Sequence, residues 1–438
     1  MHYPSVAVIV LNYNGLEYLE DCCSSLSRLD YPTDCLELVL ADNASTDGSL
    51  DFVRNRFPHM RVLPFEKNHG FCAGNNLAVA QTDSELVAFL NTDMKVDPHW
   101  LAALVETLKT ETDVVCASSK ILNWDGSRID FGGTLLQYLG HARAVGYGNS
   151  DLSAYDDVHY ILAPCGGAML IERQVFLDVG GFDEDFVAYF EDVDLGWRLW
   201  LLGHKVVLVP ESICHHAHFG SFSKQPDAKI QYLYERNALS TIIKNYEDRY
   251  LSQILPLALL LHAKRAHLFG EMSGLDLTRC RFDLETPTQA SQVARSGMRY
   301  YLQSAWRMLQ NEGPAALWHA LRQELERRHG DPTTPSTAFA PAARQQELFW
   351  IQQAYLAAVS DVVDRYGDLL NKRAGLQEQR RRSDREIFET VQALSFGVCM
   401  DTPEYRHTHE RLRDLFAIKE LFGENFDPDL PFAQRREG

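Results

Sequence analysis

Long apolar runs are missing from this sequence of 438 residues, and their absence excludes a class of protein. No segment approaches the roughly 18 consecutive apolar residues that a membrane-spanning helix requires. A secretory signal is also not recognisable, because the first apolar run, Val6–Leu11, has only the length of a strand and leads into polar Asn12. We therefore expect no bilayer span and a cytoplasmic location.

Cys-x-x-Cys motifs and an excess of basic charge are missing as well. The nine cysteines are scattered and no two form a Cys-x-x-Cys pair, so we interpret them as reduced packing residues rather than zinc or redox ligands. The formal net charge of -18 opposes binding along nucleic acid, which requires clustered Lys and Arg. A nucleotide ligand remains compatible with this charge, because a metal ion and backbone amides can hold a small anion locally.

What is present in the first part of the chain is an α/β pattern. Strand-length apolar runs are typical of buried parallel strands, and they occur at Val6–Leu11, Leu36–Ala41, Leu86–Leu90 and Val114–Ser118. Helix-length segments separate them, such as Leu16–Leu29 with apolar residues at helical spacing. Strand-helix-strand units of this kind predict a mostly parallel sheet with right-handed crossovers.

The second part of the chain is predicted to be mainly α-helical. We expect one domain over residues 1–245 and a helical region over 246–438, with a proline-rich loop or linker near 331–342. Gln345–Leu370 carries apolar residues at helical steps. The apolar run Ile254–Leu261 is followed by basic residues, so it predicts either a core or interdomain helix or a helix lying on an anionic membrane surface.

Polar residues follow the predicted strands. Tyr13 and Asp42 come directly after the first two, and Asn91, Thr92 and Asp93 close a later one. In open α/β sheets a ligand lies beyond the carboxyl ends of the strands, where one cleft can collect such residues. A hard divalent cation needs few protein carboxylates there, although strand-end acids also serve as turn and helix caps.

The remaining candidates lie further along the chain. The segment Asn68–Asn76 opens a predicted helix, and its glycines allow close approach of a ligand to the backbone. Three acids, Glu191, Asp192 and Asp194, lie among aromatic residues, whose apolar surroundings favour a general base; the alternative is an exposed acidic helix start. Histidines stand at 215, 216 and 218, where they could bind a metal or pack in a polar loop.

In their order along the chain, these motifs resemble glycosyltransferase family two, and particularly its rhamnosyltransferase-like branch. The resemblance covers about the first 245 residues and extends to Arg236-Asn237. It implies inverting enzymes with the nucleotide-binding GT-A fold. Asn91 departs from the wider GT-A pattern, which often has an Asp at this position, and so leaves one carboxylate for a cation.

The resemblance also implies roles for individual residues. Residues that would hold or line the nucleotide sugar are Tyr13, Asp42, Asn68, Gly70, Asn75, Asn91 and Thr92. Asp93 and His216 would bind Mg²⁺ or Mn²⁺, with His215 and His218 as rival ligands. Asp192 would be the catalytic base, and Glu191 would support the base or the acceptor.

The expected activity is therefore metal-dependent transfer of a sugar from a dTDP- or UDP-linked donor to a glycan or lipid-linked glycan in surface polysaccharide biosynthesis. Two alternatives are a non-catalytic module that binds a sugar nucleotide and a nucleotidyltransferase. The second would need a basic glycine-rich loop after the first strand, where this chain has Asn12-Tyr13-Asn14-Gly15. We expect the helical region to bind the acceptor, contact the membrane periphery or form a homo-oligomer.

Overall fold

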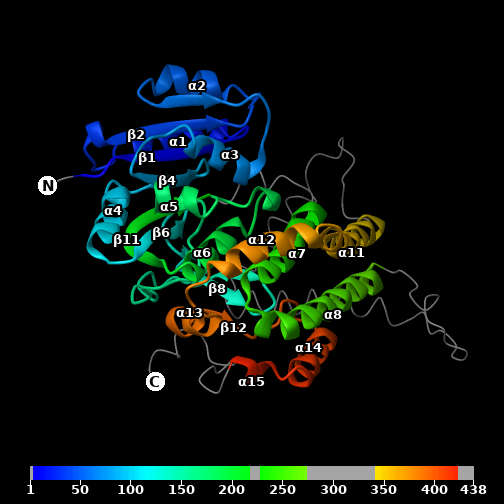
Figure 1. Ribbon diagram of the computed structural model, residues 1–438. Helices are drawn as coiled ribbons and strands as arrows, with labels where there is room; N and C mark the ends of the chain where they lie inside the picture. Colours follow the sequence, from blue (N-terminus) through cyan, green and yellow to red (C-terminus); the bar gives the residue numbers. More distant parts are fainter. Residues whose placement is uncertain (1–2, 218–226, 274–340, 423–438) are drawn as a thin grey trace, which may run out of the picture. The chain divides into compact units, whose positions relative to one another are not determined.

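The computed structural model describes residues 3–217, 227–273 and 341–422 (Figure 1). The chain groups into two compact units, residues 1–261 with 358–438, and residues 262–357. The predicted loop or linker near 331–342 lies outside the described residues up to 340, and the described chain resumes at Pro341 in helix α11.

The helices and strands have the following bounds. The strands of the main sheet are β1 (Val6–Asn12), β2 (Leu36–Asp42), β3 (Arg61–Pro64), β4 (Leu86–Asn91), β5 (Met94–Val96), β6 (Val114–Asn123), β7 (Ile129–Phe131), β10 (Ala168–Glu172) and β11 (Lys205–His216). A second sheet contains β8 (Thr134–Gln137), β9 (Ala142–Ala144) and β12 (Leu394–Ser395). The helices are α1 (Leu16–Leu26), η1 (Thr33–Cys35), α2 (Ser49–Arg56), α3 (Gly70–Val79), α4 (Trp100–Thr110), α5 (Arg173–Asp178), η2 (Glu184–Phe186), α6 (Glu191–Leu201), α7 (Asp227–Asn245), α8 (Asp248–Met272), α11 (Pro341–Asp364), α12 (Tyr366–Glu378), α13 (Asp384–Val391), α14 (Pro403–Leu415) and α15 (Ile418–Phe422).

The main sheet confirms the expected α/β class and the GT-A fold. Its strand order is β3-β2-β1-β4-β10-β6-β11-β5, with β7 paired to β6. The pairs β1/β2, β1/β4, β2/β3 and β6/β11 are parallel. The apolar strands are buried because helices cover the sheet: α3 packs on β1 and β2, and α4 packs on β6 and β11.

β10 is one of the strands of the main sheet that the four apolar runs did not predict. β10 runs antiparallel between β4 and β6, so the glycine-containing segment before it, Cys165–Gly167, lies beside the end of β4. The parallel neighbour of β6 is β11, which continues to His216 and pairs with the short β5 directly after Asp93. This mixed arrangement brings the middle of the sequence to the strand ends of its first part.

The first compact unit continues past residue 245 into the C-terminal helices. α12 packs against α7 and α13 packs against α6 (Figure 1). Arg373 of α12 donates a 2.8 Å hydrogen bond to the carbonyl of Ile243, and β12 pairs with β8. The helix expected over Gln345–Leu370 is divided, since α11 ends at Asp364 and α12 begins at Tyr366.

The apolar run Ile254–Leu261 lies within α8. Its residues Ile254, Leu257 and Leu261 are fully buried, whereas Leu260 on the other side of the helix is 49% exposed. One face of this run is therefore part of a core. Within the three described segments, no helix is both long and apolar enough to cross a bilayer.

Candidate active site

The ends of β1 and β2 form a buried polar pair. The register of these parallel strands places Asn12 beside Asp42, and the Asn12 amide donates a 2.8 Å hydrogen bond to the Asp42 carboxylate. The backbone N–H of Ser45 donates to the other carboxylate oxygen at 2.8 Å. Both side chains are fully buried, and among the described residues Oδ1 of Asn12 has no hydrogen-bond partner. Asp42 is thus held rigidly, next to half-buried Tyr13 in the chain.

The predicted donor-binding segment at the start of α3 lies beside this pair. Asn43 donates a 3.0 Å hydrogen bond to the carbonyl of Gly70, and Asn68 accepts one from the Gly70 N–H at 2.8 Å. Gly70 has φ +79°, and a Cβ there would lie 3.2 Å from Val187 Cγ1. Glycine therefore allows both the positive φ of the backbone and the close approach of Val187. Asn75 is almost fully buried, and its amide nitrogen donates to the Phe71 carbonyl of its own helix.

The structure brings two of the predicted metal ligands together. Nε2 of His216 lies 3.4 Å from a carboxylate oxygen of Asp93, and Nδ1 of His216 lies 2.8 Å from the carboxylate of Asp130. Burial opposes protonation of His216, but hydrogen bonds to Asp130 and Asp93 outweigh burial and raise its pKa to about 9. Asn91 and Thr92 precede Asp93, and Thr92 Oγ1 donates to the Leu11 carbonyl at the end of β1.

Strand register distinguishes His216 from His215. Successive side chains of a strand point to opposite faces, and β11 pairs His216 with Met94 and His215 with Lys95. His215 accordingly lies on the other face, where its Nε2 is 3.4 Å from a carboxylate oxygen of Asp97. His218, the third rival, lies outside the described residues.

The acidic pair lies at the start of α6, against the segment that leads into β10. Oδ2 of Asp192 accepts a 2.9 Å hydrogen bond from the N–H of Gly166. Gly167 in turn connects to β4, because its carbonyl accepts from the Asn91 N–H at 2.9 Å. A Cβ on Gly166 would lie 3.3 Å from Cβ of Asp192, and one on Gly167 would lie 2.6 Å from the Asn91 amide nitrogen. The two glycines therefore allow the acidic pair to approach the end of β4.

The acids of α6 have different electrostatic environments. Burial raises the pKa of Glu191, and the charge of neighbouring Asp192 raises it further. Oε2 of Glu191 is buried and has no hydrogen-bond partner in the described part of the chain. Burial also raises the pKa of Asp192, against the opposing effect of its hydrogen bonds from the Gly166 and Val193 amides. Carboxylates that bind protons this readily are suited to accept a proton from a substrate hydroxyl.

Asp194 belongs to a structural ion network instead. It is fully buried, with Arg198 Nε at 2.8 Å and Lys244 Nζ at 2.8 Å from its carboxylate oxygens. Burial would raise the pKa of Asp194, but these two cations lower it below the ordinary aspartate value. Asp194 therefore stays ionised, and its charge neutralises the two buried cations Arg198 and Lys244.

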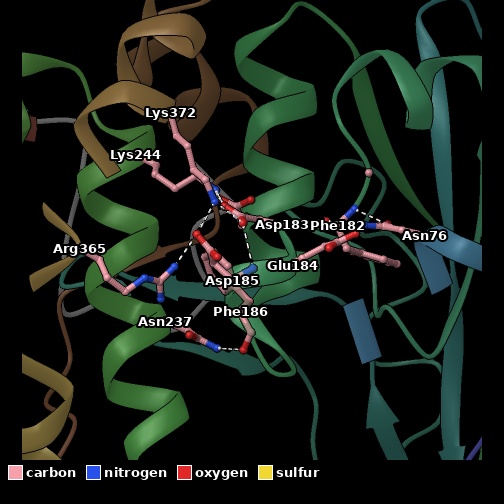
Figure 2. Close-up of polar contacts among 12 residues, drawn as sticks. Asn76, Phe182, Asp183, Glu184, Asp185, Phe186, Asn237, Lys244, Arg365 and Lys372 are labelled. Atoms are coloured by element: carbon pink, nitrogen blue, oxygen red, sulfur yellow. Dashed lines mark hydrogen bonds and ion pairs between the residues drawn. The ribbon is translucent and has the colours of Figure 1, made fainter. Parts of the chain in front are cut away.

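The backbone that leads into the acidic pair is held from α7. Asn237 donates hydrogen bonds from its amide nitrogen to the carbonyls of Phe186, Ala188 and Tyr189, at 3.1, 2.9 and 2.7 Å. Figure 2 shows Asn237 reaching Phe186 in the η2 turn. Arg236 donates to the Phe186 carbonyl at 2.9 Å. Arg236-Asn237, where the sequence resemblance ends, thus fixes the approach to Glu191.

Several residues of this cluster were not predicted as site residues. Asp130 touches His216, Asn12 touches Asp42, and Asn76 donates to the carbonyl of Phe182, shortly before η2, at 2.8 Å. Asn12 and Asn76 belong to motifs that the sequence analysis quoted, so they could have been included. Asp130 lies in a short strand outside those motifs, and only the pairing of β7 with β6 brings it to the site.

Comparisons with known proteins bear on the family of the chain. The family model described as Glycosyl transferase family 2 matches residues 7–159. The chain is 29% identical over 235 residues to the N-acetylglucosaminyl-diphospho-decaprenol L-rhamnosyltransferase of Mycobacterium tuberculosis (strain ATCC 25618 / H37Rv), which covers 48% of this chain and 75% of that protein. It is also 29% identical over 236 residues to the O-antigen biosynthesis protein RfbC of Myxococcus xanthus, covering 51% of this chain and 18% of the relative.

A solved structure of GalNAc-T7 with UDP, GalNAc and Mn2+ is 17% identical, with a TM-score of 0.46 over 58% of this chain and 51% of that chain. This likeness is too low to inform the site, and the argument from relatives depends on the sequence matches. The family model and the relatives support the family resemblance that the motifs of the first part of the chain indicate. Residues 7–159 match glycosyltransferase family 2, and the chain is a glycosyltransferase of this type in glycan biosynthesis.

Proposed function

We propose that this enzyme transfers a hexosyl group from a dTDP- or UDP-linked donor to a hydroxyl of a glycan or lipid-linked glycan, with inversion at the anomeric carbon and a divalent cation. The observation that carries the proposal is the acidic pair held against Gly166, with a Glu191 oxygen that has no hydrogen-bond partner among the described residues and with raised proton affinity on both carboxyls. Such an arrangement supports base catalysis by Asp192.

In the proposed step, Asp192 takes the proton of the acceptor hydroxyl while the hydroxyl oxygen forms a bond to the anomeric carbon. The bond from that carbon to the donor diphosphate breaks, and the nucleoside diphosphate leaves with the electron pair. Glu191 would orient the acceptor through Oε2, which has no hydrogen-bond partner in the described segments. Attack from the face opposite the leaving group inverts the configuration.

The residues near the end of β4 fit a hard divalent cation. Asp93 and His216 offer an oxygen and a nitrogen ligand 3.4 Å apart, close to the roughly 3 Å between neighbouring ligands of an octahedral ion with bonds of about 2.1 Å. No group of three or more His, Cys, Asp or Glu residues suited to a metal occurs in the described segments, so phosphate and water would complete the ligand set. Asp130 supports the site by orienting the imidazole through Nδ1. A bound Mg²⁺ or Mn²⁺ would neutralise charge on the departing diphosphate.

The nucleotide would lie beyond the ends of β1 and β2, where Tyr13, Asp42, Asn68 and Gly70 surround the strand ends. The rhamnosyltransferase relative, by its name, acts on a diphospho-decaprenol-linked sugar, which supports a lipid-linked acceptor. Contact with a membrane surface and self-association stay predictions, to be measured by vesicle flotation and light scattering.

A metal-controlled transfer assay tests this function. Purified protein would be screened by thermal shift with dTDP- and UDP-sugars, with and without Mn²⁺, because a ligand of the native state raises the melting temperature. Transfer with the binding donor should stop on chelation and return with Mg²⁺ or Mn²⁺, and NMR of the product should show inverted configuration. Asp93→Asn should abolish the metal effect while His215→Asn, on the opposite face, preserves it. Full activity after exhaustive chelation would disprove the metal assignment, and a product of retained configuration would disprove the mechanism.

A further inference from the structure

The segment before the acidic pair has an unusual backbone. Val187, Tyr189 and Phe190 all have positive φ, at 66°, 67° and 66°, although none is glycine. Left-handed conformations of such residues cost on the order of 1–3 kcal/mol each and persist only where the surroundings impose them. Phe190 is the residue directly before Glu191, so this strained backbone determines where the two acids point.

Part of the restraint comes from the first 245 residues themselves. Asn237 binds three carbonyls of the segment, and the amides of Phe71 and Cys72 in α3 donate to the Val187 carbonyl at 2.9 and 3.2 Å. These contacts hold the chain after the η2 turn. They do not hold the carboxylates of the turn itself.

The turn carries two carboxylates that are bound from the C-terminal helices. Lys372 of α12 places Nζ 2.6 Å from an oxygen of Asp183 and 2.6 Å from one of Asp185 (Figure 2). Arg365, at the start of α12, forms a second ion pair with Asp185. α12 begins more than 100 residues after α7 ends, yet it makes the bridging contact between the two acids of the turn.

The charges of this cluster are complementary. Lys244 of α7 is almost fully buried and lies 2.6 Å from Asp183 on the inner side of the turn. Burial alone would raise the pKa of Asp183, but Lys244 and Lys372 lower it well below the ordinary aspartate range. The two acids likewise outweigh the effect of burial on Lys372 and raise its pKa. The turn is therefore ionised and clamped between α7 and α12.

We propose that Lys372, supported by Arg365, is a positioning residue of the transferase: it fastens the η2 turn and thereby fixes the strained backbone that presents Glu191 and Asp192. The C-terminal helices of the first compact unit then complete the catalytic domain. This inference rests on the proposed function only in naming Asp192 as the base. Its structural part, that α12 orders residues 186–192, can be measured independently.

The test compares Lys372→Met with Lys372→Arg in the full chain. Lys372→Met removes the bridge, and misplacement of a catalytic group by about 1 Å can cost on the order of 100-fold, so we expect kcat to fall by about 10- to 100-fold. The KM for the donor should change less than kcat, because Asp42 at the end of β2 is held by Asn12 and Ser45 rather than by the turn. Lys372→Arg should restore most of kcat, and amides 186–192 should exchange faster in Lys372→Met alone. Lys419→Met, which removes an exposed lysine of α15, is the matched control and should match wild type.

A double-mutant cycle separates positioning from general stability. If Lys372 acts through the turn, Asp185→Asn should lower kcat in the same direction, and combining it with Lys372→Met should add little. Unchanged kcat and unchanged exchange in Lys372→Met would overturn the proposal. A fall in kcat that Lys372→Arg does not rescue, with additive effects of Asp185→Asn, would also overturn it. If Asp192→Asn stays active while Lys372→Met speeds exchange of 186–192, the assignment of the base fails and the clamp stands.

Discussion

Asp192→Asn is the most direct test of the catalytic assignment. The change preserves the size of the side chain but removes its ability to take a proton from the acceptor. General-base catalysis contributes about 10²–10⁴-fold, so transfer at saturating donor should fall by about that factor. The donor KM should be nearly unchanged, because the contacts of Asp192 are to Gly166 and Val193 rather than to the nucleotide-binding strand ends.

The structure also gives the expected cost in stability. Both Asp192 oxygens accept backbone N–H groups, at 2.9 Å from Gly166 and 2.8 Å from Val193. An asparagine amide can accept only one of these bonds, which leaves one donor unsatisfied at a cost of about 1–3 kcal/mol. Neutralising the group removes its repulsion with Glu191 and its own desolvation penalty, which offsets this cost. We therefore expect the free energy of unfolding to fall by less than about 2 kcal/mol.

Single-turnover transfer and denaturant unfolding of the same preparations measure these two quantities. Glu191→Gln should reduce transfer less than Asp192→Asn, since its expected role is to orient the acceptor. Near wild-type transfer by Asp192→Asn together with loss in Glu191→Gln would reassign the base to Glu191. Full activity of both variants would refute general-base catalysis by this pair.

Further outcomes follow from the charged and thiol groups. Because burial raises the pKa of Asp192, the rate of transfer should fall on the acid side at a pH above the ordinary aspartate pKa, which a kcat-pH profile measures. Asp194→Asn should lower the free energy of unfolding by about 3–5 kcal/mol, because it removes the carboxylate that pairs with buried Arg198 and one of the two carboxylates that pair with buried Lys244. The pKa of Asp194 is lowered in the folded state, so the difference in unfolding free energy between wild type and Asp194→Asn should be full at neutral pH and should shrink as the pH falls below the ordinary aspartate pKa. Unfolding measured over a series of pH values tests this, and a difference that stays constant with pH would contradict it. The sulfur of exposed Cys399 lies 3.4 Å from Nδ1 of His141, and Cys399 and Glu235 outweigh the effect of burial and raise the pKa of His141 to about 10. Cys399 should therefore react with iodoacetamide before the buried cysteines, and His141→Asn should slow that reaction.

The sequence determined the features that depend on neighbouring residues. Apolar runs at Val6–Leu11 and Leu36–Ala41 predicted β1 and β2 to within one residue, because a strand buried on both faces needs uninterrupted apolar side chains. The position of polar residues after these strands predicted a cleft at their carboxyl ends, since that position follows from the parallel sheet itself. The ordered motifs then predicted the family.

Only the tertiary structure decided which distant residues meet. The register of β11 with β5 places His216 rather than His215 beside Asp93, and the pairing of β7 adds Asp130. The antiparallel insertion of β10 brings Gly166 to Asp192. Strand order and register depend on the whole sheet, and no local period of apolar residues encodes them.

The clearest example is α12. Its sequence predicted only a helix, and the break after α11 at Asp364 was not apparent from the apolar spacing. Lys372 looks like any charged residue on a helix surface until α12 packs on α7 and the lysine reaches Asp183 and Asp185. The strain at Val187 and Phe190 was equally hidden, because left-handed backbone in non-glycine residues is imposed by surrounding contacts rather than by the residues themselves.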